Sequence, residues 1–531
     1  MIFTFEKYGI NLDIAMRAYN DGYAYKYYIN DNSGSYTQMT VGEENSEFVM
    51  PDNSKMFIQP ANLERDYFSY EETYLEVRPN RINGTLISMP VLYQTKDDVY
   101  SLITEADLYG HGYIGSFLKG TKDGSLVTVP SYGASSQNLC ELPFETPWRL
   151  GVVGTLDTII SSTLVEDVYG EVEYWKPDNY DDLSDEEKEI YNYDWVTPGA
   201  AAWDWLYNQK NQGDYDMHKE YLELAKEMNW KWIILDGGWT PQDPDDILGF
   251  QELVADAHAN GIKVMVWGWA HIHMGEYDNM IKMLDLWKSR GIDGVKIDYF
   301  DGNEQPTAER VESQNTLKIT ERLYQECAKR QMVVNCHGCN KPTGERRVYP
   351  HVINREAVRG NEMVNNISEF LTTIPFIRGT IGPTDYTPTL LPMNENVTVG
   401  HQLALHVLLE TGSISMGDKI NVYQESIAKD FLSKLPATFD DIKYLGGTPA
   451  SYCVLARQKG DDWWIGGNTV SEREVEIDLS FLKDGNYEAD IYFDGEDYLT
   501  LDNRKETINS SSKLTVKMNK NGGFAIRIIK K

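Results

Sequence analysis

The central part of the chain, residues 190–440, alternates short apolar runs with segments of helical periodicity. The runs WIILD (232–236), KVMVW (263–267), GVKID (294–298) and MVVNC (332–336) each follow an amphipathic helical pattern. Strands and helices that alternate this often build parallel sheets covered by helices, so we predict a (β/α)8 TIM barrel here. A doubly wound open sheet is the alternative, but no phosphate-binding turn follows the first strand.

The regions on either side of the barrel have the pattern of short β-strands. Near the start, Leu12, Ile14 and Met16 alternate with more polar neighbours, and Asn20-Asp21-Gly22 supplies a turn before a second strand. We predict an N-terminal β-sandwich over residues 1–175 and a small C-terminal β-sandwich over 441–531. The acidic stretch 178–190 is expected to be a solvated linker or a short surface helix.

The net charge of the chain limits the classes of partner that it can bind. The net charge is −33, which disfavours binding to nucleic acid or to an anionic membrane and suits a neutral substrate. No apolar segment reaches the length of a membrane-spanning helix. Glu6 and Lys7 interrupt the N-terminus where a signal peptide would be apolar. We therefore expect a cytoplasmic protein, or a periplasmic or secreted one if a leader has been removed.

Three short patterns suggest other functions, and each has a simpler explanation. Gly110 to Gly115 match G-x-G-x-x-G but lie in a β region without a βαβ unit, so they do not indicate dinucleotide binding. His271-Ile272-His273 could hold a metal, but no third ligand is near in sequence. Cys336 and Cys339 form a C-x-x-C pair without a second pair, and two partly buried thiols are the better interpretation.

Acidic residues follow several of the predicted barrel strands. Asp236 ends WIILD, Asp298 ends GVKID, Glu356 ends VINRE, and Glu362 comes six residues later. The carboxyl ends of barrel strands form the active face. Any one of these residues could cap a helix, but several carboxylates at one rim indicate cation binding or acid-base catalysis. Cleavage of a glycosidic bond needs two such carboxyls, one protonated and one ionised.

Longer motifs follow one another along the barrel in a fixed order, and together they resemble glycoside hydrolase family 97. The motifs are DWVTPGAAAWDWLYNQKNQG (194–213), WIILDGGW, GVKIDYF, VVNCHGCNKPTGERRVYP (333–350), VINREAVRGNE (352–362) and GPTDYTP (382–388). The two flanking sandwiches fit the three-domain plan of that family. Since family members usually have more strands before this point, we expect either that residues are missing from the start of the N-terminal sandwich or that the gene is truly short.

The resemblance implies a retaining mechanism. Inverting members carry a catalytic glutamate after the His of the fifth-strand motif, where this chain has Gly338 after His337. Retaining members instead carry an aspartate nucleophile at the end of the fourth strand, the position of Asp298. The general acid/base of the family maps to Glu362.

The resemblance also implies a calcium ion in the active site. Its expected ligands are Glu105, Glu356 and Glu362, and three carboxylates leave room for water and sugar hydroxyls. The residues expected to bind sugar hydroxyls are Trp203, Asp204, Asp236, Lys296 and His337.

Four functions remain open at this point. The first is a retaining exo-enzyme that releases terminal α-galactose. The others are a retaining β-L-arabinopyranosidase, an inverting α-glucosidase, which Gly338 disfavours, and a non-catalytic sugar-binding protein, which the intact pair Asp298 and Glu362 disfavours.

Overall fold

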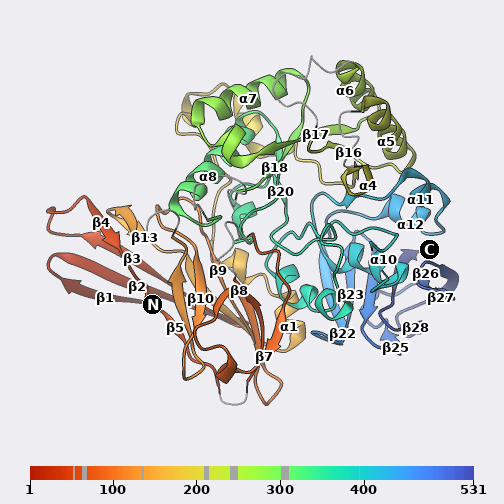
Figure 1. The fold of residues 1–531 in the computed structure, drawn as a ribbon, viewed down its shortest axis with the longest axis horizontal. Helices are drawn as coiled ribbons and strands as arrows, with labels where there is room; N and C mark the ends of the chain where they lie inside the picture. The colour runs from red at the N-terminus through yellow and green to blue at the C-terminus, as the bar shows by residue number, and fades with distance from the viewer. Residues whose placement is uncertain are drawn as a thin grey trace.

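Three regions follow one another across the molecule in Figure 1: an N-terminal β region, a central barrel and a C-terminal β-sheet. The computed structural model describes residues 1–51, 54–61, 69–132, 137–208, 214–238, 249–300, 310–393 and 395–531.

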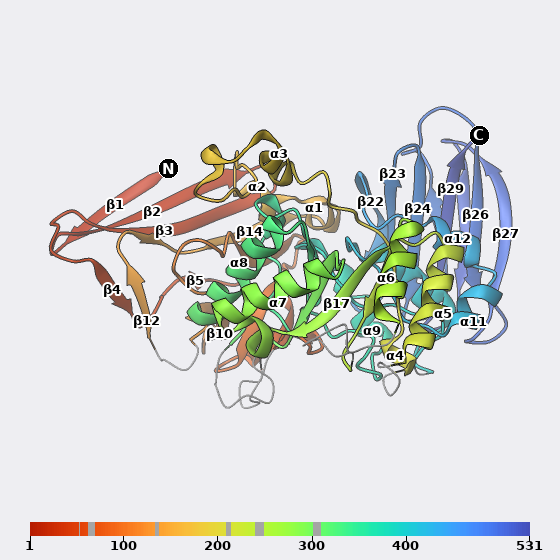
Figure 2. The same cartoon turned by 90° about the horizontal axis from the view of Figure 1, so that it is seen from above.

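The N-terminal region is a twelve-stranded antiparallel sheet with a separate two-stranded pair. Its second hairpin pairs β2 (Ile10–Tyr19) with β3 (Gly22–Asp31) around the Asn20-Asp21 turn, as the alternation in the sequence predicts. Figure 2 shows that β1 to β3 extend away from the barrel. The remaining strands are β1 (Ile2–Lys7), β4 (Gln38–Val41), β5 (Glu47–Phe48), β6 (Lys55–Pro60), β7 (Leu75–Val77), β8 (Leu86–Gln94), β9 (Tyr100–Ala106), β10 (Ser116–Gly120), β11 (Leu126–Pro130), β12 (Asn138–Glu141), β13 (Phe144–Glu145) and β14 (Trp148–Gly154).

The central sheet is parallel throughout and curls into a (β/α)8-type barrel. In the order of the chain, its strands are β15 (Ala201–Trp203), β16 (Trp232–Leu235), β17 (Lys263–Trp269), β18 (Gly294–Asp298), β19 (Val333–Cys336), β20 (Val352–Arg355) and β21 (Ser415–Met416). Irregular chain closes the gap between β20 and β21, because Gly412 N donates to Ile353 O over 2.9 Å and Asp385 N donates to Arg355 O over 2.9 Å. The closure confirms the barrel and excludes the open sheet.

Amphipathic helices cover the barrel strands. Two of the longest begin at polar caps: Ser313 accepts from Thr316 N before α8 (Gln314–Lys329), and Asp214 accepts from Met217 N before α5 (Tyr215–Glu227). The other helices of eight residues or more are α6 (Phe250–Ala259), α7 (Tyr277–Ser289) and α10 (Val399–Leu408). The apolar faces of α5, α6, α7 and α8 bury Leu, Met and Trp side chains against the outside of the barrel sheet.

Short helical elements lie in the N-terminal region, in the linker and in the barrel loops. They are η1 (Pro79–Arg81), α1 (Leu156–Ser161), α2 (Leu164–Asp167), η2 (Tyr180–Asp182), α3 (Asp185–Lys188), η3 (Glu189–Asn192), α4 (Trp205–Asn208), η6 (Ala270–Met274), η7 (Glu345–Arg347), α9 (Ser368–Leu371), η8 (Ile374–Phe376), η9 (Arg378–Thr380), α11 (Ile420–Glu425) and α12 (Lys429–Lys434).

The C-terminal region is antiparallel, with a six-stranded sheet and a two-stranded pair. Its strands are β22 (Asp441–Thr448), β23 (Tyr452–Lys459), β24 (Asp462–Thr469), β25 (Arg473–Asp478), β26 (Tyr487–Asp494), β27 (Leu501–Ile508), β28 (Lys513–Met518) and β29 (Gly523–Lys530). Helix α10 packs on this sheet, so the barrel and the C-terminal region share a buried interface.

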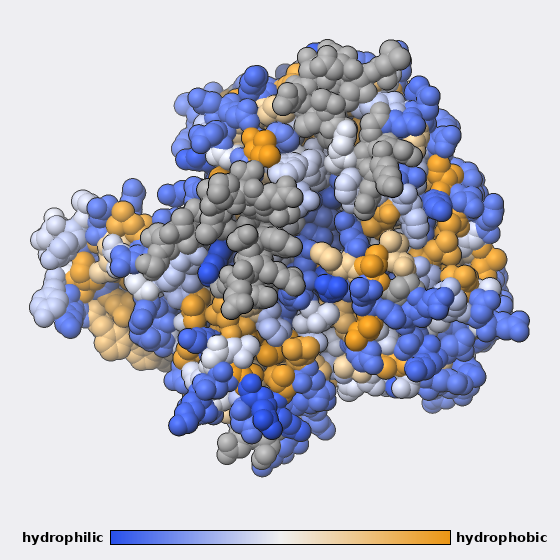
Figure 3. Space-filling view, viewed as in Figure 1, coloured by the Kyte–Doolittle hydropathy of each residue, from blue (hydrophilic) through white to orange (hydrophobic). Residues whose placement is uncertain are grey.

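The surface is mainly hydrophilic on the face drawn in Figure 3, as the strong negative charge predicts, with hydrophobic patches over the N-terminal sheet. Among the described residues, no helix combines the length and the apolar character that a membrane crossing requires.

Candidate active site

Asp298 is the last residue of β18 and lies at the carboxyl rim of the barrel. Its Oδ2 accepts a hydrogen bond from Trp267 Nε1 over 3.2 Å, and its Oδ1 accepts one from Tyr299 N over 2.8 Å. The Lys296 ammonium is 3.8 Å from Oδ2. These donors fix the carboxylate, which keeps 17 % of its side-chain surface exposed and is therefore accessible to a ligand at the rim.

Glu362 lies in the loop after β20 and faces the same rim. Its Oε2 accepts from Trp205 Nε1 over 3.2 Å. Burial raises the pKa of the Glu362 carboxyl, and the nearby positive charges of Lys296 and His337 only partly oppose that rise. A carboxyl with a raised pKa can hold a proton at neutral pH and deliver it to a leaving group.

Glu356 lies beside Glu362, and the carboxylate of Glu71 from the N-terminal region also acts on it. Ligand atoms of His337, Glu356 and Glu362 all lie within 4.8 Å of one another. Burial raises the pKa of the Glu356 carboxyl well above its usual range, and the negative charges of Glu71, Asp298 and Glu362 raise it further. Gly338 N donates to Glu356 Oε2 over 2.9 Å. A bound cation would relieve this repulsion.

Lys296 links two of the predicted site residues. Its ammonium is 2.9 Å from Asp236 Oδ2, which also accepts from Trp203 Nε1 over 2.6 Å. Trp203 is fully buried, and its ring lies under the Lys296 ammonium at 5.2 Å. Trp203 therefore supports Asp236 and Lys296 rather than presenting its own face to a sugar.

The other two predicted sugar-binding residues, His337 and Asp204, lie in different surroundings. His337 points its Nε2 to Asp385 Oδ2 over 2.8 Å and has its Nδ1 3.5 Å from Glu356 Oε2, so it belongs to the site. Asp204 is buried with its Oδ2 3.4 Å from His218 Nδ1 of α5. Asp204 therefore contacts the helix layer through His218.

Glu105 does not join the expected metal ligands. It is fully buried in β9, where Lys341 Nζ lies 2.6 Å from its Oε1 and Arg149 contacts its Oε2. The group formed by His337, Glu356 and Glu362 does not include it. The N-terminal carboxylate whose negative charge acts on Glu356 is Glu71.

Three residues of this site were missed from the sequence: Glu71, Trp205 and Trp267. Glu71 belongs to an irregular segment before β7, where no periodicity singles out an acidic residue. The two tryptophans could have been found, because Trp205 lies inside the DWVTPGAAAWDW motif and Trp267 ends KVMVW. Aromatic residues at strand ends face the same rim as the carboxylates and form platforms for sugar rings.

The remaining sequence patterns have structural roles. Burial raises the pKa of the Cys336 and Cys339 thiols, which makes them unreactive. His273 Nδ1 accepts from Trp269 N over 2.9 Å and His271 Nε2 lies 3.1 Å from Phe300 O, so the two histidines hold the turn after β17.

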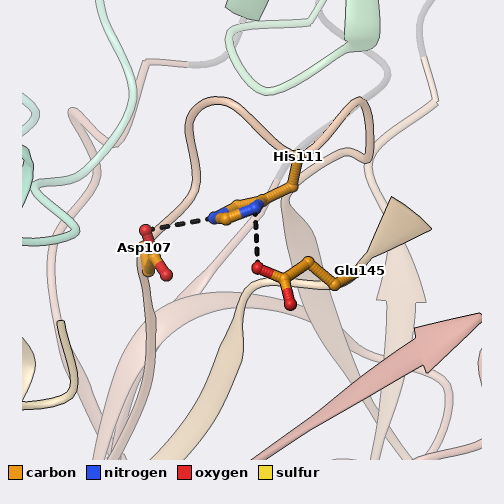
Figure 4. A group of neighbouring side chains, drawn as sticks. All are labelled: Asp107, His111 and Glu145. Carbon is orange, nitrogen blue, oxygen red and sulfur yellow. Dashed lines mark ion pairs between the residues drawn. The ribbon is translucent and has the colours of Figure 1, made fainter. Parts of the chain in front are cut away.

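The glycine-rich loop 110–115 connects β9 and β10, and His111 anchors it (Figure 4). The two ring nitrogens of His111 lie 3.1 Å from Asp107 Oδ1 and 3.0 Å from Glu145 Oε1. Burial disfavours the charged imidazolium, but the hydrogen bonds and charges of Asp107 and Glu145 outweigh it and raise the pKa of His111 to about 9. The three residues form an ion triad that closes the loop.

A (β/α)8 barrel with paired carboxyls at its rim, between two β regions, defines a glycoside hydrolase of the multidomain kind. Three family profiles match this chain: Glycosyl-hydrolase 97 N-terminal over residues 1–169, Glycoside hydrolase 97 over 195–358, and Glycosyl-hydrolase 97 C-terminal, oligomerisation, over 438–529. The chain belongs to glycoside hydrolase family 97, as its motifs predicted.

Similar proteins agree with this assignment. A retaining alpha-galactosidase of Bacteroides thetaiotaomicron is 28% identical over 97% of this chain and 83% of its own length. A protein of Streptomyces bingchenggensis with the name "Probable retaining alpha-galactosidase" is 29% identical over 97% of this chain and 77% of its own length. A family 97 enzyme of Pseudoalteromonas sp. strain K8, solved in complex with panose, has the same fold, with a TM-score of 0.85 at 22% identity over 98% of this chain and 85% of its own.

Proposed function

We propose that the chain is a retaining exo-α-galactosidase in which Asp298 is the nucleophile and Glu362 the acid/base. The observation that carries the proposal is the packing of Gly338 against Asp298. A Cβ atom at residue 338 would lie 2.8 Å from Asp298 Oδ1 and 2.7 Å from Tyr299 N, closer than real Cβ contacts. The carboxylate of Asp298 therefore occupies the space where inverting members of the family carry their glutamate, and one chain has room for only one of the two arrangements.

The reaction has two displacements. First, an Asp298 oxygen forms a bond to the anomeric carbon while the glycosidic C–O bond breaks and the leaving oxygen takes the proton of Glu362. Then a water molecule gives a proton to the Glu362 carboxylate and attacks the anomeric carbon, which releases the sugar and the Asp298 carboxylate. The raised pKa of Glu362 suits the first step, because the group begins protonated.

The residues around Glu356 fit a calcium ion. Glu71 and Glu356 offer hard oxygen donors, whereas His337 is turned toward Asp385 and Glu362 keeps its proton for the first displacement. A bound Ca²⁺ would supply a positive charge that orients sugar hydroxyls and offsets the repulsion among the carboxylates. Addition of calcium to metal-free protein should raise the melting temperature, and Glu71→Gln should remove most of that rise. A melting temperature that calcium does not change would exclude this ion.

The sugar is assigned from the relatives. Two curated relatives with names of retaining alpha-galactosidases align with 97% of this chain. The buried pair of Asp236 and Lys296, 2.9 Å apart, supplies an acceptor and a donor for sugar hydroxyls at the rim. Trp205 and Trp267 both lie beside Gly237 and offer aromatic faces for the ring.

The experiment that tests the proposal is NMR of the anomeric proton in freshly released sugar. p-Nitrophenyl α-galactoside and p-nitrophenyl β-L-arabinopyranoside have the same ring configuration, and the second lacks only the hydroxymethyl group. We expect initial product of retained configuration, formed faster from the galactoside. Inverted product would reject Asp298 as the nucleophile, and preference for the arabinopyranoside would reject galactose as the sugar.

A further inference from the structure

A buried ion cluster joins the N-terminal sheet to the barrel beside the active site. Lys341 Nζ is 2.6 Å from Glu105 Oε1 and 2.6 Å from Glu312 Oε1, and the side chains of all three residues are fully buried. Glu105 belongs to β9, whereas Glu312 immediately precedes the cap of α8 and Lys341 belongs to the loop after β19. The lysine thus bridges two carboxylates from the two regions.

The cluster is too costly to be explained by stability alone. Arg149 of β14 contacts Glu105 and is 2.8 Å from Glu44 Oε2, so the three carboxylates of Glu44, Glu105 and Glu312 share two cations. Buried ion pairs lose about as much free energy in desolvation as they gain in attraction, and apolar residues often replace them without loss. Buried ions with a definite geometry are best explained by the unique arrangement that they impose on neighbouring segments.

Tyr70 connects this cluster to the active site. Its hydroxyl donates to Glu312 Oε1 over 2.7 Å and accepts from Lys341 Nζ over 3.3 Å. The backbone of Tyr70 has φ +68, a left-handed conformation that is unfavourable for a tyrosine. The Gln59 amide holds this conformation from the other side, because it donates to Tyr70 O and to Glu72 O, each over 2.8 Å.

The next residue is Glu71, whose backbone carbonyl accepts from Arg359 Nη1 over 3.5 Å. Arg359 belongs to the loop between Glu356 and Glu362, and the charge of Glu71 acts on Glu356. Lys341 follows Gly338 by three positions, and Gly338 N donates to the same Glu356 carboxylate over 2.9 Å. One loop of the barrel therefore orients Glu356 through Gly338 and reaches the segment that carries Glu71 through Lys341.

We propose that Lys341 is a positioning residue that, through Glu105, Glu312 and the Tyr70 hydroxyl, holds Glu71 of the N-terminal region in the active site. Glu105 is then a support of this device, which accounts for its full burial away from Glu356. The effect on calcium affinity that we expect from this contact rests on the proposed function. The positioning of Glu71 by Lys341 does not.

Hydrogen exchange measured by mass spectrometry tests the positioning directly. In Lys341→Met and in Tyr70→Phe, amides of segment 69–74 should exchange at least about tenfold faster than in the unchanged protein. The matched control is Arg457→Met, which removes a buried cation at the interface of α10 and the C-terminal sheet, where Arg457 Nε donates to Val407 O over 2.8 Å. That control should leave segment 69–74 unchanged. Tyr70→Phe removes a single hydroxyl, so it decides the matter if Lys341→Met unfolds; unchanged exchange in Tyr70→Phe would overturn the proposal.

Calcium titration by calorimetry then tests the consequence. Lys341→Met and Glu71→Gln should each weaken calcium binding by about tenfold or more, and the double variant should be no weaker than Glu71→Gln alone. Losses that multiply in the double variant would show that Lys341 acts independently of Glu71, against the proposal. If the unchanged protein binds no calcium, the metal assignment fails while the exchange experiment still decides the positioning.

Discussion

The indole Nε1 of Trp267 donates to Asp298 Oδ2 over 3.2 Å, and the indole Nε1 of Trp205 has the same relationship to Glu362 Oε2, also over 3.2 Å. An indole N–H donates one hydrogen bond and does not titrate near neutral pH. Each proposed catalytic carboxyl is therefore held by a donor that cannot exchange protons with it. Asp298 and Glu362 can then be oriented while only their own protons move in the reaction.

Trp267→Phe should lower kcat/KM by about ten- to a hundredfold, since a hydrogen bond to a charged group contributes roughly 1.5–3 kcal/mol. The phenyl ring keeps the apolar packing, so the melting temperature should change little. The control is Trp269→Phe, a tryptophan on the same strand whose ring contacts Trp267 and Tyr299. If both variants have equal kcat/KM values, the hydrogen bond to Asp298 has no special role.

Asp298→Gly should lower kcat on the order of 10⁴-fold or more with the fold intact, because the nucleophile is lost. Azide should restore part of the turnover by entering the space that the carboxylate leaves. The azide adduct should have the configuration opposite to that of the substrate, since only one displacement then occurs. The measurement is NMR of the glycosyl azide, and an adduct of retained configuration would contradict the assignment.

Gly338→Ala should inactivate the protein and destabilise it by about 1–2 kcal/mol. The backbone of Gly338 has φ +50, which strains any residue with a Cβ, and the added Cβ would also push against Asp298. Gly261→Ala separates the two causes, because Gly261 has φ +69 but no neighbour within 4 Å of the added Cβ. Kinetics and urea unfolding should show destabilisation in both variants and loss of activity in Gly338→Ala alone; full activity in Gly338→Ala would mean that Asp298 tolerates the displacement.

The sequence was sufficient to predict the barrel, because the periodicities of its strands and helices follow local rules. WIILD and GVKID become β16 and β18 with nearly the predicted bounds, and the ends of parallel strands necessarily share a rim. That rule alone predicts that Asp236 and Asp298 lie on one face of the barrel. The last barrel strand, β21, is only Ser415–Met416, because irregular chain closes the barrel there.

The residues that the sequence misplaced depend on contacts between distant segments. Glu71 and Glu105 both belong to the N-terminal region, and only the three-dimensional packing shows that Glu71 acts on Glu356 whereas Glu105 pairs with Lys341. Asp204 is a similar case, since its neighbour His218 lies on a helix fourteen residues later. No periodicity encodes such pairings, so motif position alone could not show which N-terminal carboxylate acts on Glu356.

The ion triad of Asp107, His111 and Glu145 should make stability depend on alkaline pH. The pKa of His111 is raised to about 9 in the folded protein, above the usual histidine value of 6.5, so the folded state holds this proton more tightly than the unfolded state. The contribution of the triad is therefore fully present below about pH 6.5 and is lost as the pH rises through about 9.

The difference in melting temperature between the unchanged protein and His111→Gln should be largest near pH 6 and vanish near pH 10. The control is His258→Gln, which removes a more exposed histidine that is 2.8 Å from Asp293 on the surface of the barrel; its difference should be small throughout. A His111→Gln difference that stays constant from pH 6 to pH 10 would show that His111 contributes packing rather than charge.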